Sequence, residues 1–400
     1  MVLVKPTPFL LAINYFSASA FTARVPRAVN SLTINGISYT NVEYIKRDVV
    51  IVGGGSSGTY AAIGLIDAQK VYPVTGLTED YGVIVYHNID LVKRYAARLN
   101  VTLAAADTSS GTTIYADFRT GVENSTYSTV NFTTGLALYM AQLQKYPYIE
   151  TSFDLPNPVP KIFCSALETL LSSTISATTS SAFLPTLRKV LETYYPNPLS
   201  QAIIGDENVF LNARIVAVNR SGNCAQVLIS TPSGYKFIDA KKLVFTIPPK
   251  IDNLDGWDLS VSEKTLFPQF NNSGYYVGVF GNTGLPSAPT TIPNVFNLYY
   301  GSPTSLTDDE VRAAMFAEFN RLHVKNMTNT TPKLLAYTRH TPFELWVPAE
   351  TIAAGFYSKL NALQGQKNTF YTGAAFHTHD SSLLWEFTQA LLPNITASLS

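Results

Sequence analysis

Cysteine, charge and long apolar runs are all scarce in this sequence. Cys164 and Cys224 are the only cysteines, and they have no metal-ligand spacing, which excludes a cysteine-based zinc site and a disulfide framework. Lys plus Arg and Asp plus Glu number 28 each, so no net charge attracts nucleic acid or an anionic membrane surface. No run of about eighteen apolar residues occurs, and we therefore predict no membrane span.

Histidine is also sparse, with five residues in the chain. His377 and His379, at positions i and i+2, would share one face of a strand. Because no further ligand stands at a matching spacing, we predict that the protein has no metal site.

Apolar and aromatic residues, by contrast, are plentiful. The 400 residues are 46% hydrophobic and include 23 Tyr and 22 Phe. A chain of this length and composition can bury a large core in two or three compact units. The aromatic content suits either an ordinary thick core or the lining of a large apolar cavity, and the core is the simpler interpretation.

The first thirty residues are typical of a secretory leader. Lys5 precedes an apolar stretch over residues 9–16, and Ala18 and Ala20 flank Ser19 in the small-x-small form of a signal-peptidase site. We therefore predict a signal peptide and leader over residues 1–30 and a secreted protein. Eight Asn-x-Ser/Thr glycosylation sequons agree with secretion. They begin at Asn100, Asn124, Asn131, Asn219, Asn271, Asn326, Asn329 and Asn394.

The stretch over residues 47–62 organises the chain. A β-branched apolar run at residues 49–52 leads into a glycine-rich turn, and small residues then begin a helix. This order predicts the strand, turn and helix of a dinucleotide-binding βαβ unit. In such a unit Gly53 permits the tight turn, Gly55 lets the backbone approach a diphosphate, and Gly58 allows close packing of helix on strand. The free N–H groups of the helix start would face the diphosphate.

The pattern breaks down after the helix, which we expect to end near Ala68. A dinucleotide fold requires a second buried strand here, ending in an acid that binds the ribose. Pro73 disfavours a central strand in the segment that follows. Glu79 stands at a tolerable distance for the ribose ligand, but no buried β run precedes it, so an ordinary solvated loop acid is the favoured interpretation.

Further along, the chain alternates strand and turn signals. Residues 81–88 are strand-like and precede a helix over about 90–99, and residues 101–135 read as an antiparallel sheet. A β-meander is predicted over residues 208–218, 224–230 and 235–238, and a buried strand over 241–247 stops at Pro248 and Pro249. Asp380 or Ser381 is a fair N-cap for a C-terminal helix.

Together these segments resemble the FAD-dependent amine oxidase superfamily, and within it the fungal β-cyclopiazonate dehydrogenase-like flavoproteins. The resemblance covers most of the chain and is weakest across residues 161–205. The residues that carry it are 48–63, 80–92, 208–219, 241–254, 340–343, 355–357 and, most specifically, 363–385.

The resemblance implies an α/β (α+β) fold of amine oxidase or glutathione reductase-like architecture. A Rossmann-like FAD-binding domain with a β-meander would comprise residues 47–100, 205–250 and 365–400. A mixed substrate-binding domain would comprise residues 101–204 and 251–364. The first βαβ unit departs from the family pattern, because the strand ending in Glu and the Arg-x-Gly-Gly turn that follow the first helix in the family are missing between Ala68 and Asp80.

The resemblance also implies roles for specific residues. Two groups of residues would contact FAD. The FAD would be bound non-covalently, since no flavin-linking Cys stands in the C-terminal segment. The first group would cradle the diphosphate, with Glu79 as the ribose candidate: Gly53, Gly55, Ser57 and Gly58. The second would return to the isoalloxazine ring: Gly373, Ala374, Asp380, Ser381, Ser382 and Leu383. A third group either lines the substrate cavity or packs in the core, and both interpretations stay open: Tyr275, Tyr276, Tyr299, Tyr300 and His340.

The implied reaction is a two-electron oxidation, with hydride transfer to flavin N5 from an amine or indole-like secondary metabolite. The flavin performs this chemistry, so no protein nucleophile is needed. The alternative hypothesis is a non-catalytic or truncated relative with weak or no FAD binding. An NAD-dependent dehydrogenase is disfavoured, because it has no use for the C-terminal segment that begins at Tyr371.

Overall fold

The computed structural model describes residues 27–34, 37–68, 86–100, 204–283, 295–321 and 330–399, together with single residues between 103 and 144. Glu79, the leader up to residue 26, most of the antiparallel region at 101–135 and the segment 161–203 lie outside the described residues. No described helix is long and apolar enough to cross a membrane.

Six of the described strands form the first sheet. They are β1 (Arg27–Ile34), β2 (Ile37–Val52), β3 (Arg214–Asn219), β4 (Ala225–Thr231), β5 (Gly234–Phe245) and β10 (Thr369–Tyr371). Their order is β1-β2-β5-β4-β3, and β10 pairs with the end of β5. β3, β4 and β5 form the predicted antiparallel meander, whereas β2 and β10 run parallel to β5.

β2 confirms the strand predicted before the glycine turn, but it is 16 residues long and begins in a hairpin with β1. Its last residues are apolar without alternation because both faces of the strand are covered. Val49 and Ile51 pack on one side with α1 and α11, and Val50 and Val52 pack on the other side. The loosely alternating residues before them belong to the part of the hairpin that leaves one face in solvent.

β5 joins two segments that the sequence predicts separately. Its first half alternates exposed and buried residues, whereas residues 243–245 are all buried. The burial pattern changes in mid-strand because the first half belongs to the half-solvated meander and the second half lies in the layered core. The strand itself is continuous, and it ends as predicted before Pro248.

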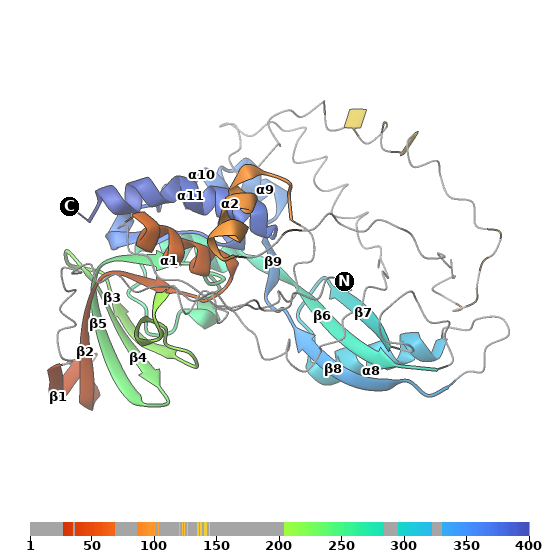
Figure 1. Ribbon diagram of the computed structural model, residues 1–400, viewed down its shortest axis with the longest axis horizontal. Coiled ribbons are helices and arrows are strands. Elements are labelled where there is room, and N and C mark those ends of the chain that lie inside the picture. The colour runs from red at the N-terminus through yellow and green to blue at the C-terminus, as the bar shows by residue number, and fades with distance from the viewer. Residues whose placement is uncertain are drawn as a thin grey trace, which may run out of the picture.

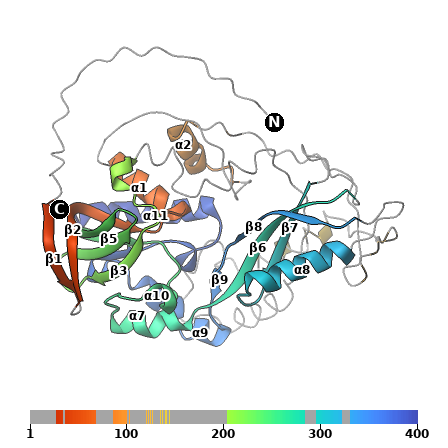
Figure 2. The ribbon, with the colours of Figure 1, turned by 90° about the horizontal axis from the view of Figure 1, so that it is seen from below.

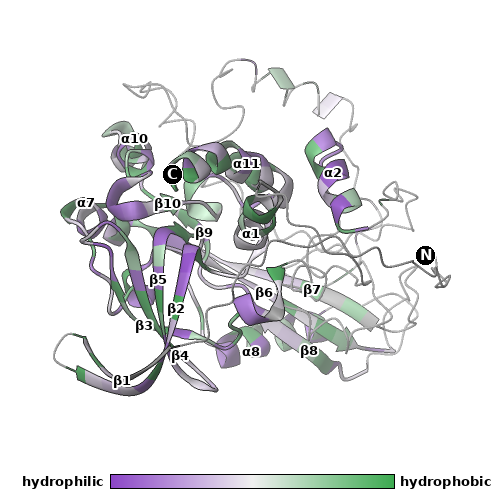
Figure 3. Cartoon of the chain, turned by 60° about the vertical axis from the view of Figure 1, so that its left-hand side comes forward, coloured by the Kyte–Doolittle hydropathy of each residue, from purple (hydrophilic) through white to green (hydrophobic). Residues whose placement is uncertain are grey.

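Among the described elements, α1 (Ser56–Ala68) and α11 (Ser381–Ala397) cover one face of this sheet (Figure 1), and α2 (Asp90–Arg98) packs on the outer side of these two helices. α11 lies along α1, and a Cβ at Gly64 would stand 2.4 Å from the Leu392 side chain, so the two helices pack closely. α2 is amphipathic and buries Val92 and Tyr95, and Figure 3 shows hydrophilic and hydrophobic residues side by side along it.

Short helices cover the other face of the sheet, as Figure 2 shows for α7 and α10. They are η3 (Ile251–Asn253), α7 (Val261–Leu266), η4 (Phe267–Gln269), α9 (Ala349–Ala353) and α10 (Phe356–Asn361). Leu266, Phe356 and Leu360 join the core beneath Leu243 and Phe245. Parts of the segment 251–364, predicted as substrate domain, therefore pack with the first sheet.

The second sheet contains β6 (Asn271–Gly281), β7 (Val295–Ser302), β8 (Lys333–Arg339) and β9 (Phe343–Trp346). Its order is β7-β6-β8, and β9 pairs with the start of β6. α8 (Asp308–Arg321) covers one face with Val311, Met315 and Phe319. Figure 1 shows β9 between the two sheets. The remaining described elements are the short helices η2 (Asp206–Asn208), η5 (Gln366–Asn368) and η6 (Ala374–Phe376).

A buried arginine ties the elements of the first core together. Arg220, 1% exposed, follows β3 and donates to Asp258 at 2.8 Å and to Glu263 of α7 at 2.9 Å. Burial acts to raise the pKa of Glu263, but hydrogen bonds from Arg220 and Tyr371 and the Arg220 charge outweigh it and hold that pKa below its usual range. The network also includes Lys367, which pairs with Asp258 at 2.8 Å.

Candidate functional site

Three parallel strands end at the same edge of the first sheet. Val52 of β2 pairs with Phe245 of β5, and Phe245 pairs with Tyr371 of β10. In open α/β sheets ligands bind outside the carboxyl ends of parallel strands. Each strand leads directly into a segment singled out in the sequence: the glycine turn (residues 53–58), the double-proline stop and the segment after residue 372.

The glycine turn is built as its spacing predicts. Gly53 has φ +112°, a conformation that favours glycine, and a Cβ on it would stand 2.2 Å from Thr246 Oγ1. A Cβ on Gly58 would stand 2.1 Å from the carbonyl oxygen of Gly53. Both glycines are therefore required for the close approach of turn and helix. Ser57, at the start of α1, is buried.

Gly55 differs from Gly53 and Gly58 because no atom beyond the adjoining residues lies within 4 Å of the position that its Cβ would take. Gly54 and Gly55 are both exposed. The first N–H groups of a helix have no acceptor within the helix and carry a partial positive charge. The open side of the turn, next to the start of α1, thus has the space and the donors that a diphosphate needs.

Thr246 contacts two glycine-containing segments, the glycine turn and the segment that includes Gly373. Its hydroxyl donates to the carbonyl oxygen of Val52 at 2.9 Å, beside the glycine turn. Its own carbonyl oxygen would stand 2.9 Å from a Cβ on Gly373, which has φ +103°. Ala374 follows and begins η6. No signal in the sequence marks Thr246 as a site residue, although the strand 241–247 that carries it is part of the resemblance.

The C-terminal helix starts at the same edge. Of the two predicted N-cap candidates, Asp380 caps α11, since its carboxylate accepts from the N–H of Leu383 at 3.0 Å. Ser381 and Ser382 are buried, and Ser382 Oγ accepts from the N–H of His87 at 3.0 Å. His87 Nε2 lies 3.5 Å from Asp380 Oδ2. His87 therefore ties the segment before α2 to the start of α11.

Side-chain contacts fix α11 against α1. Trp385 Nε1 donates to Ser56 Oγ at 2.9 Å, at the first residue of α1. The Tyr60 ring stacks on Trp385 at 5.9 Å, and its hydroxyl donates to Gln389 at 2.7 Å. The two helix starts are therefore held side by side, and the donors of both face the edge where the strands end.

Aromatic rings gather on one face of the second sheet and on the segment that leads to α11. We call this set the aromatic face, and it consists of Tyr275, Tyr299, His340, Phe343 and His379. The Tyr275 ring is stacked on Phe343 at 4.9 Å and on Tyr299 at 6.2 Å, and it lies 5.8 Å from His340. Phe343 in turn lies 4.6 Å from His379, which precedes the α11 cap. The face therefore spans the seam between the second sheet and the C-terminal segment.

The environment of the aromatic face disfavours charge of either sign. Burial raises the pKa of Tyr275 to about 12, and the neighbouring Tyr299 adds to this. Burial lowers the pKa of His379 to about 4 and also lowers the pKa of His340. Both imidazoles are nevertheless exposed at the surface. Water therefore reaches the rings, although protein atoms surround them. All three groups are uncharged near neutral pH.

Tyr276 and Tyr300 do not join this face. Successive residues of a strand point to opposite sides, so the two tyrosines lie on the face that α8 covers. Tyr276 is 0% exposed, its hydroxyl accepts from the N–H of Leu306 at 2.7 Å, and Tyr300 packs beside it. Of the two interpretations left open for Tyr276, the structure supports core packing.

Within the described ranges no group of three His, Cys, Asp or Glu side chains could hold a metal ion. His377 and His379 have different surroundings. His377 is buried and stacks on Phe387 at 5.0 Å, whereas His379 belongs to the aromatic face.

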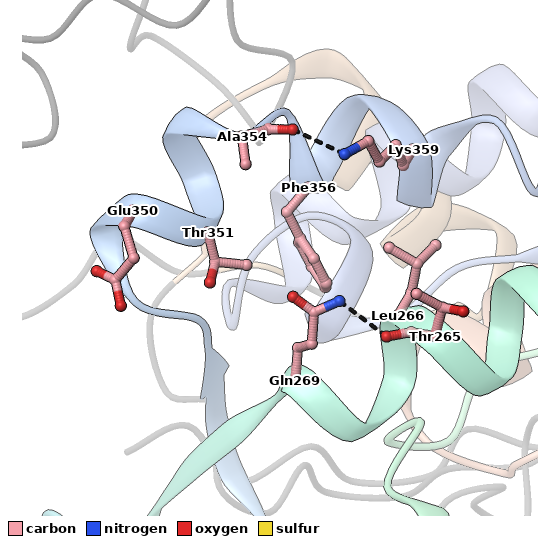
Figure 4. Close-up of a pocket in the computed structure, with 8 residues that line it drawn as sticks. All are labelled: Thr265, Leu266, Gln269, Glu350, Thr351, Ala354, Phe356 and Lys359. Carbon is pink, nitrogen blue, oxygen red and sulfur yellow. Dashed lines mark hydrogen bonds between the residues drawn. The ribbon is translucent and has the colours of Figure 1, made fainter.

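A hollow of about 320 Å³ lies between α7 and the α9–α10 pair (Figure 4). Two of its polar side chains already have partners, since Lys359 donates to the Ala354 carbonyl and Gln269 to the Thr265 carbonyl, both at 2.8 Å. It contains none of the predicted site residues, and α7 and α10 lie on the side of the sheet opposite α1.

Sequence comparison connects this arrangement to known proteins, although no family model matches the chain. The chain is 32% identical to FAD-dependent oxidoreductase oblC of Cochliobolus heterostrophus, over 96% of this chain and 98% of that protein. It is 27% identical to β-cyclopiazonate dehydrogenase of Aspergillus oryzae, over 91% and 96%. The first alignment runs over 475 positions, more than the 400 residues of this chain, so that relative carries segments that are lacking here.

Solved structures share the fold. A fatty acid isomerase from P. acnes superposes with a TM-score of 0.56 at 15% identity, over 87% of this chain and 98% of the other. A putrescine oxidase variant superposes with a TM-score of 0.51 at 13% identity, over 88% and 100%. At these identities the likeness concerns the fold alone.

Proposed function

This chain belongs to the fungal family of FAD-dependent oxidoreductases that includes β-cyclopiazonate dehydrogenase, and we propose that it oxidises a small organic molecule with FAD. When bound, FAD supplies two-electron chemistry and accepts a hydride at N5 from a C–H bond next to nitrogen or carbon. An amine or an indole-like secondary metabolite is the substrate that we propose.

The observation that supports this proposal is that the glycine turn and the segment that includes Gly373 meet at Thr246. Gly53, Gly55, Ser57 and Gly58 would hold the diphosphate, because the turn leaves its open side beside the first N–H groups of α1. No side chain charge is needed for that contact, since backbone donors and the helix dipole provide it.

The second segment would hold the ring of the cofactor. Gly373 and Ala374 leave the sheet beside Thr246, and Asp380, Ser381, Ser382 and Leu383 begin α11 nearby. The N–H groups at this helix start would stabilise negative charge on the reduced ring. We propose non-covalent attachment, because Cys164 and Cys224 are the only cysteines and neither belongs to this segment.

The aromatic face is the proposed substrate wall. It joins the C-terminal segment through the contact of Phe343 with His379. Tyr275, Tyr299 and His340 would then bound the space next to the cofactor ring and contact the substrate with their rings.

The experiment that tests the proposal is purification of the full chain followed by titration with FAD. We expect a yellow protein, or one that becomes yellow with added FAD and gains thermal stability in proportion to the ligand. Release of free FAD by denaturation would confirm non-covalent attachment. A protein that stays colourless and shows no change in Tm with FAD would contradict the proposal.

A second candidate, a relative with weak or no FAD binding, is favoured by one observation. β2 pairs with β1 through residues 37–44 and with β5 through residues 43–52. The strand that would continue a Rossmann-like sheet on the other edge of residues 45–52, with its ribose ligand, would come between Ala68 and Asp80, where the sequence lacks the family's strand ending in Glu. The same titration separates the two candidates, because a missing ribose contact lowers the affinity for FAD without changing the fold.

A further inference from the structure

The last residue of β10 is held by a side chain on the edge that faces away from β5. Among the described strands β10 pairs with β5, and the N–H of Thr372 donates to the Phe245 carbonyl oxygen at 2.9 Å. Successive residues of a parallel strand point their backbone groups to alternate edges, so those of Tyr371 point away from β5. Gln364 contacts both groups. Its Oε1 accepts from the Tyr371 N–H at 2.8 Å, and its Nε2 donates to the Tyr371 carbonyl oxygen at 2.7 Å.

This pair of bonds requires an amide. Tyr371 is 1% exposed, so its backbone groups need partners within the protein. An amide side chain offers an acceptor and a donor on adjacent atoms, whereas a carboxylate of the same size offers acceptors only. The next residue extends the contact, since the N–H of Gly365 donates to the Thr369 carbonyl oxygen at 2.8 Å. Gln364 and Gly365 together therefore cover the outer edge of β10 as a neighbouring strand would.

The following residue ties the segment to α11. Thr372 Oγ1 lies 2.8 Å from Thr388 Oγ1, and both side chains are buried. The Thr388 hydroxyl donates to the Leu384 carbonyl oxygen at 2.7 Å, so its single proton is in use and Thr372 is the donor of the pair. Residues 371–372 are thus fixed to β5, to Gln364 and to α11 directly before the chain leaves the sheet.

Gly373 and Ala374, which follow, have no polar side chain that could fix them in place. A Cβ on Gly373 would stand 2.9 Å from the Thr246 carbonyl oxygen, so the backbone passes close to β5 at this point. The position of both residues is therefore set by the residues before them. A shift of Tyr371 would move the proposed cofactor segment with it, and binding groups need supporting contacts to hold their geometry.

We propose that Gln364 is a positioning residue for the cofactor, because its amide fixes the end of β10 and thereby the place where Gly373 and Ala374 contact FAD. The inference rests on the proposed function, since it concerns the same cofactor segment. It has a consequence for Gln364→Glu. A protonated carboxyl can accept from the Tyr371 N–H and donate to the Tyr371 carbonyl oxygen, whereas a carboxylate can only accept.

The test measures the dissociation constant of FAD for the full chain by flavin fluorescence, from about pH 8 to about pH 5. Gln364→Glu should bind FAD about tenfold more weakly than the wild type at neutral pH. The Tyr371 carbonyl oxygen accepts only from the protonated acid and so raises the pKa of the introduced carboxyl above its usual value of about 4.3. The ratio of the two affinities should therefore approach one as the pH falls. Gln364→Leu, which can form neither bond, should stay about tenfold weaker at every pH.

The charges near this segment stay constant over that pH range. Arg220 pairs with Glu263, and Lys367 pairs with Asp258. Hydrogen bonds from these cations outweigh burial and lower the pKa of both carboxyls, which therefore stay ionised. Burial raises the pKa of Tyr371, so its hydroxyl stays neutral. Because each affinity is compared with that of the wild type at the same pH, titration elsewhere in the protein cancels.

Gln366→Glu is the matched control. Gln366 lies two residues further along, is exposed, and donates from Nε2 to the Ala362 carbonyl oxygen at 2.6 Å. It receives the same change of charge without touching β10, and it should bind FAD as the wild type does at every pH. Circular dichroism verifies the fold of each variant, and urea unfolding without FAD measures its stability.

Two outcomes would overturn the inference. Gln364→Glu could lose stability and still bind FAD with wild-type affinity at every pH, which would make the role of Gln364 purely structural. Alternatively, its loss of affinity could be the same at every pH in a folded protein, although the protonated acid can form both bonds. A wild type that binds no FAD would contradict the proposed function and this inference with it, whereas wild-type binding that Gln364→Glu leaves unchanged contradicts this inference alone.

Discussion

Gly55 and Gly58 stand three residues apart in one turn, but their surroundings differ. The Cβ position of Gly58 is occupied by the carbonyl oxygen of Gly53, and that of Gly55 is open. Gly58→Ala should therefore destabilise the fold by about 1–3 kcal/mol through overpacking. Gly55→Ala should leave the free energy of unfolding unchanged and weaken FAD binding by about tenfold, because its methyl group would stand where the diphosphate approaches.

Urea unfolding and FAD titration of the two variants check this prediction. Gly222→Ala is the matched control, because Gly222 lies in an exposed turn with no atom near its Cβ position, and it should change neither quantity. Unchanged FAD affinity in Gly55→Ala would remove the glycine turn from the cofactor site.

Also at the scale of single residues, Arg220 forms a buried charge network with Asp258 and Glu263. Arg220→Met would leave Asp258 and Glu263 without their shared cation and should cost about 3–5 kcal/mol of stability at neutral pH. The pKa values of both carboxyls are held below their usual range in the native protein. Their contribution to stability is therefore present above the unfolded pKa of about 4 and is lost as the pH falls through the lowered native values.

Urea midpoints measured between neutral and acid pH check this prediction. The difference between wild type and Arg220→Met should shrink on acidification, because protonated carboxyls no longer need the arginine. Arg339→Met, which removes a partner of the exposed pair with Asp308, should cost less than about 1 kcal/mol at any pH. A loss of similar size in both variants would argue against the network.

At the scale of elements, the start of α11 is the feature that the cofactor would contact. Asp380→Ala removes the N-cap and should cost about 1 kcal/mol, whereas Asp380→Ser should restore most of it. We also expect weaker FAD binding in Asp380→Ala, because a frayed first turn presents its N–H groups less regularly.

Thermal unfolding and FAD titration measure the two effects separately. Ser260→Ala is the matched control, since Ser260 caps α7 in a capping box on the other side of the sheet. It should lose comparable stability and keep the FAD affinity of the wild type. Equal loss of affinity in both variants would mean that the effect comes from stability alone.

At the scale of the whole molecule, the sequon asparagines are distributed over the surface. Those that the structure describes, Asn100, Asn124, Asn219, Asn271 and Asn394, are all exposed. If the chain enters a eukaryotic secretory pathway, we expect N-linked glycans and a decrease in mass on N-glycosidase treatment. An unchanged mass in protein recovered from the medium would contradict the glycosylation prediction.

The sequence predicted the local units of the fold because each has a short-range signal. The apolar run of β2, the glycine turn and the start of α1 follow from residues 49–58, and the cap of α11 follows from Asp380. The meander with its turn at Ser233 and Gly234 is equally local. These predictions depend on periodicity, glycine conformations and capping, which neighbouring residues determine.

What the tertiary structure decided depends on contacts between distant segments. Thr246 meets Gly53 and Gly373 because β2, β5 and β10 pair in parallel with their ends aligned. Strand alternation placed Tyr275 and Tyr276 on opposite faces, but only the packing of α8 showed which of them is buried. The sequence by itself determined the turn that can hold a diphosphate. The tertiary structure determined which side chains surround that turn, because strand register and helix packing are set by side chains far apart in the chain.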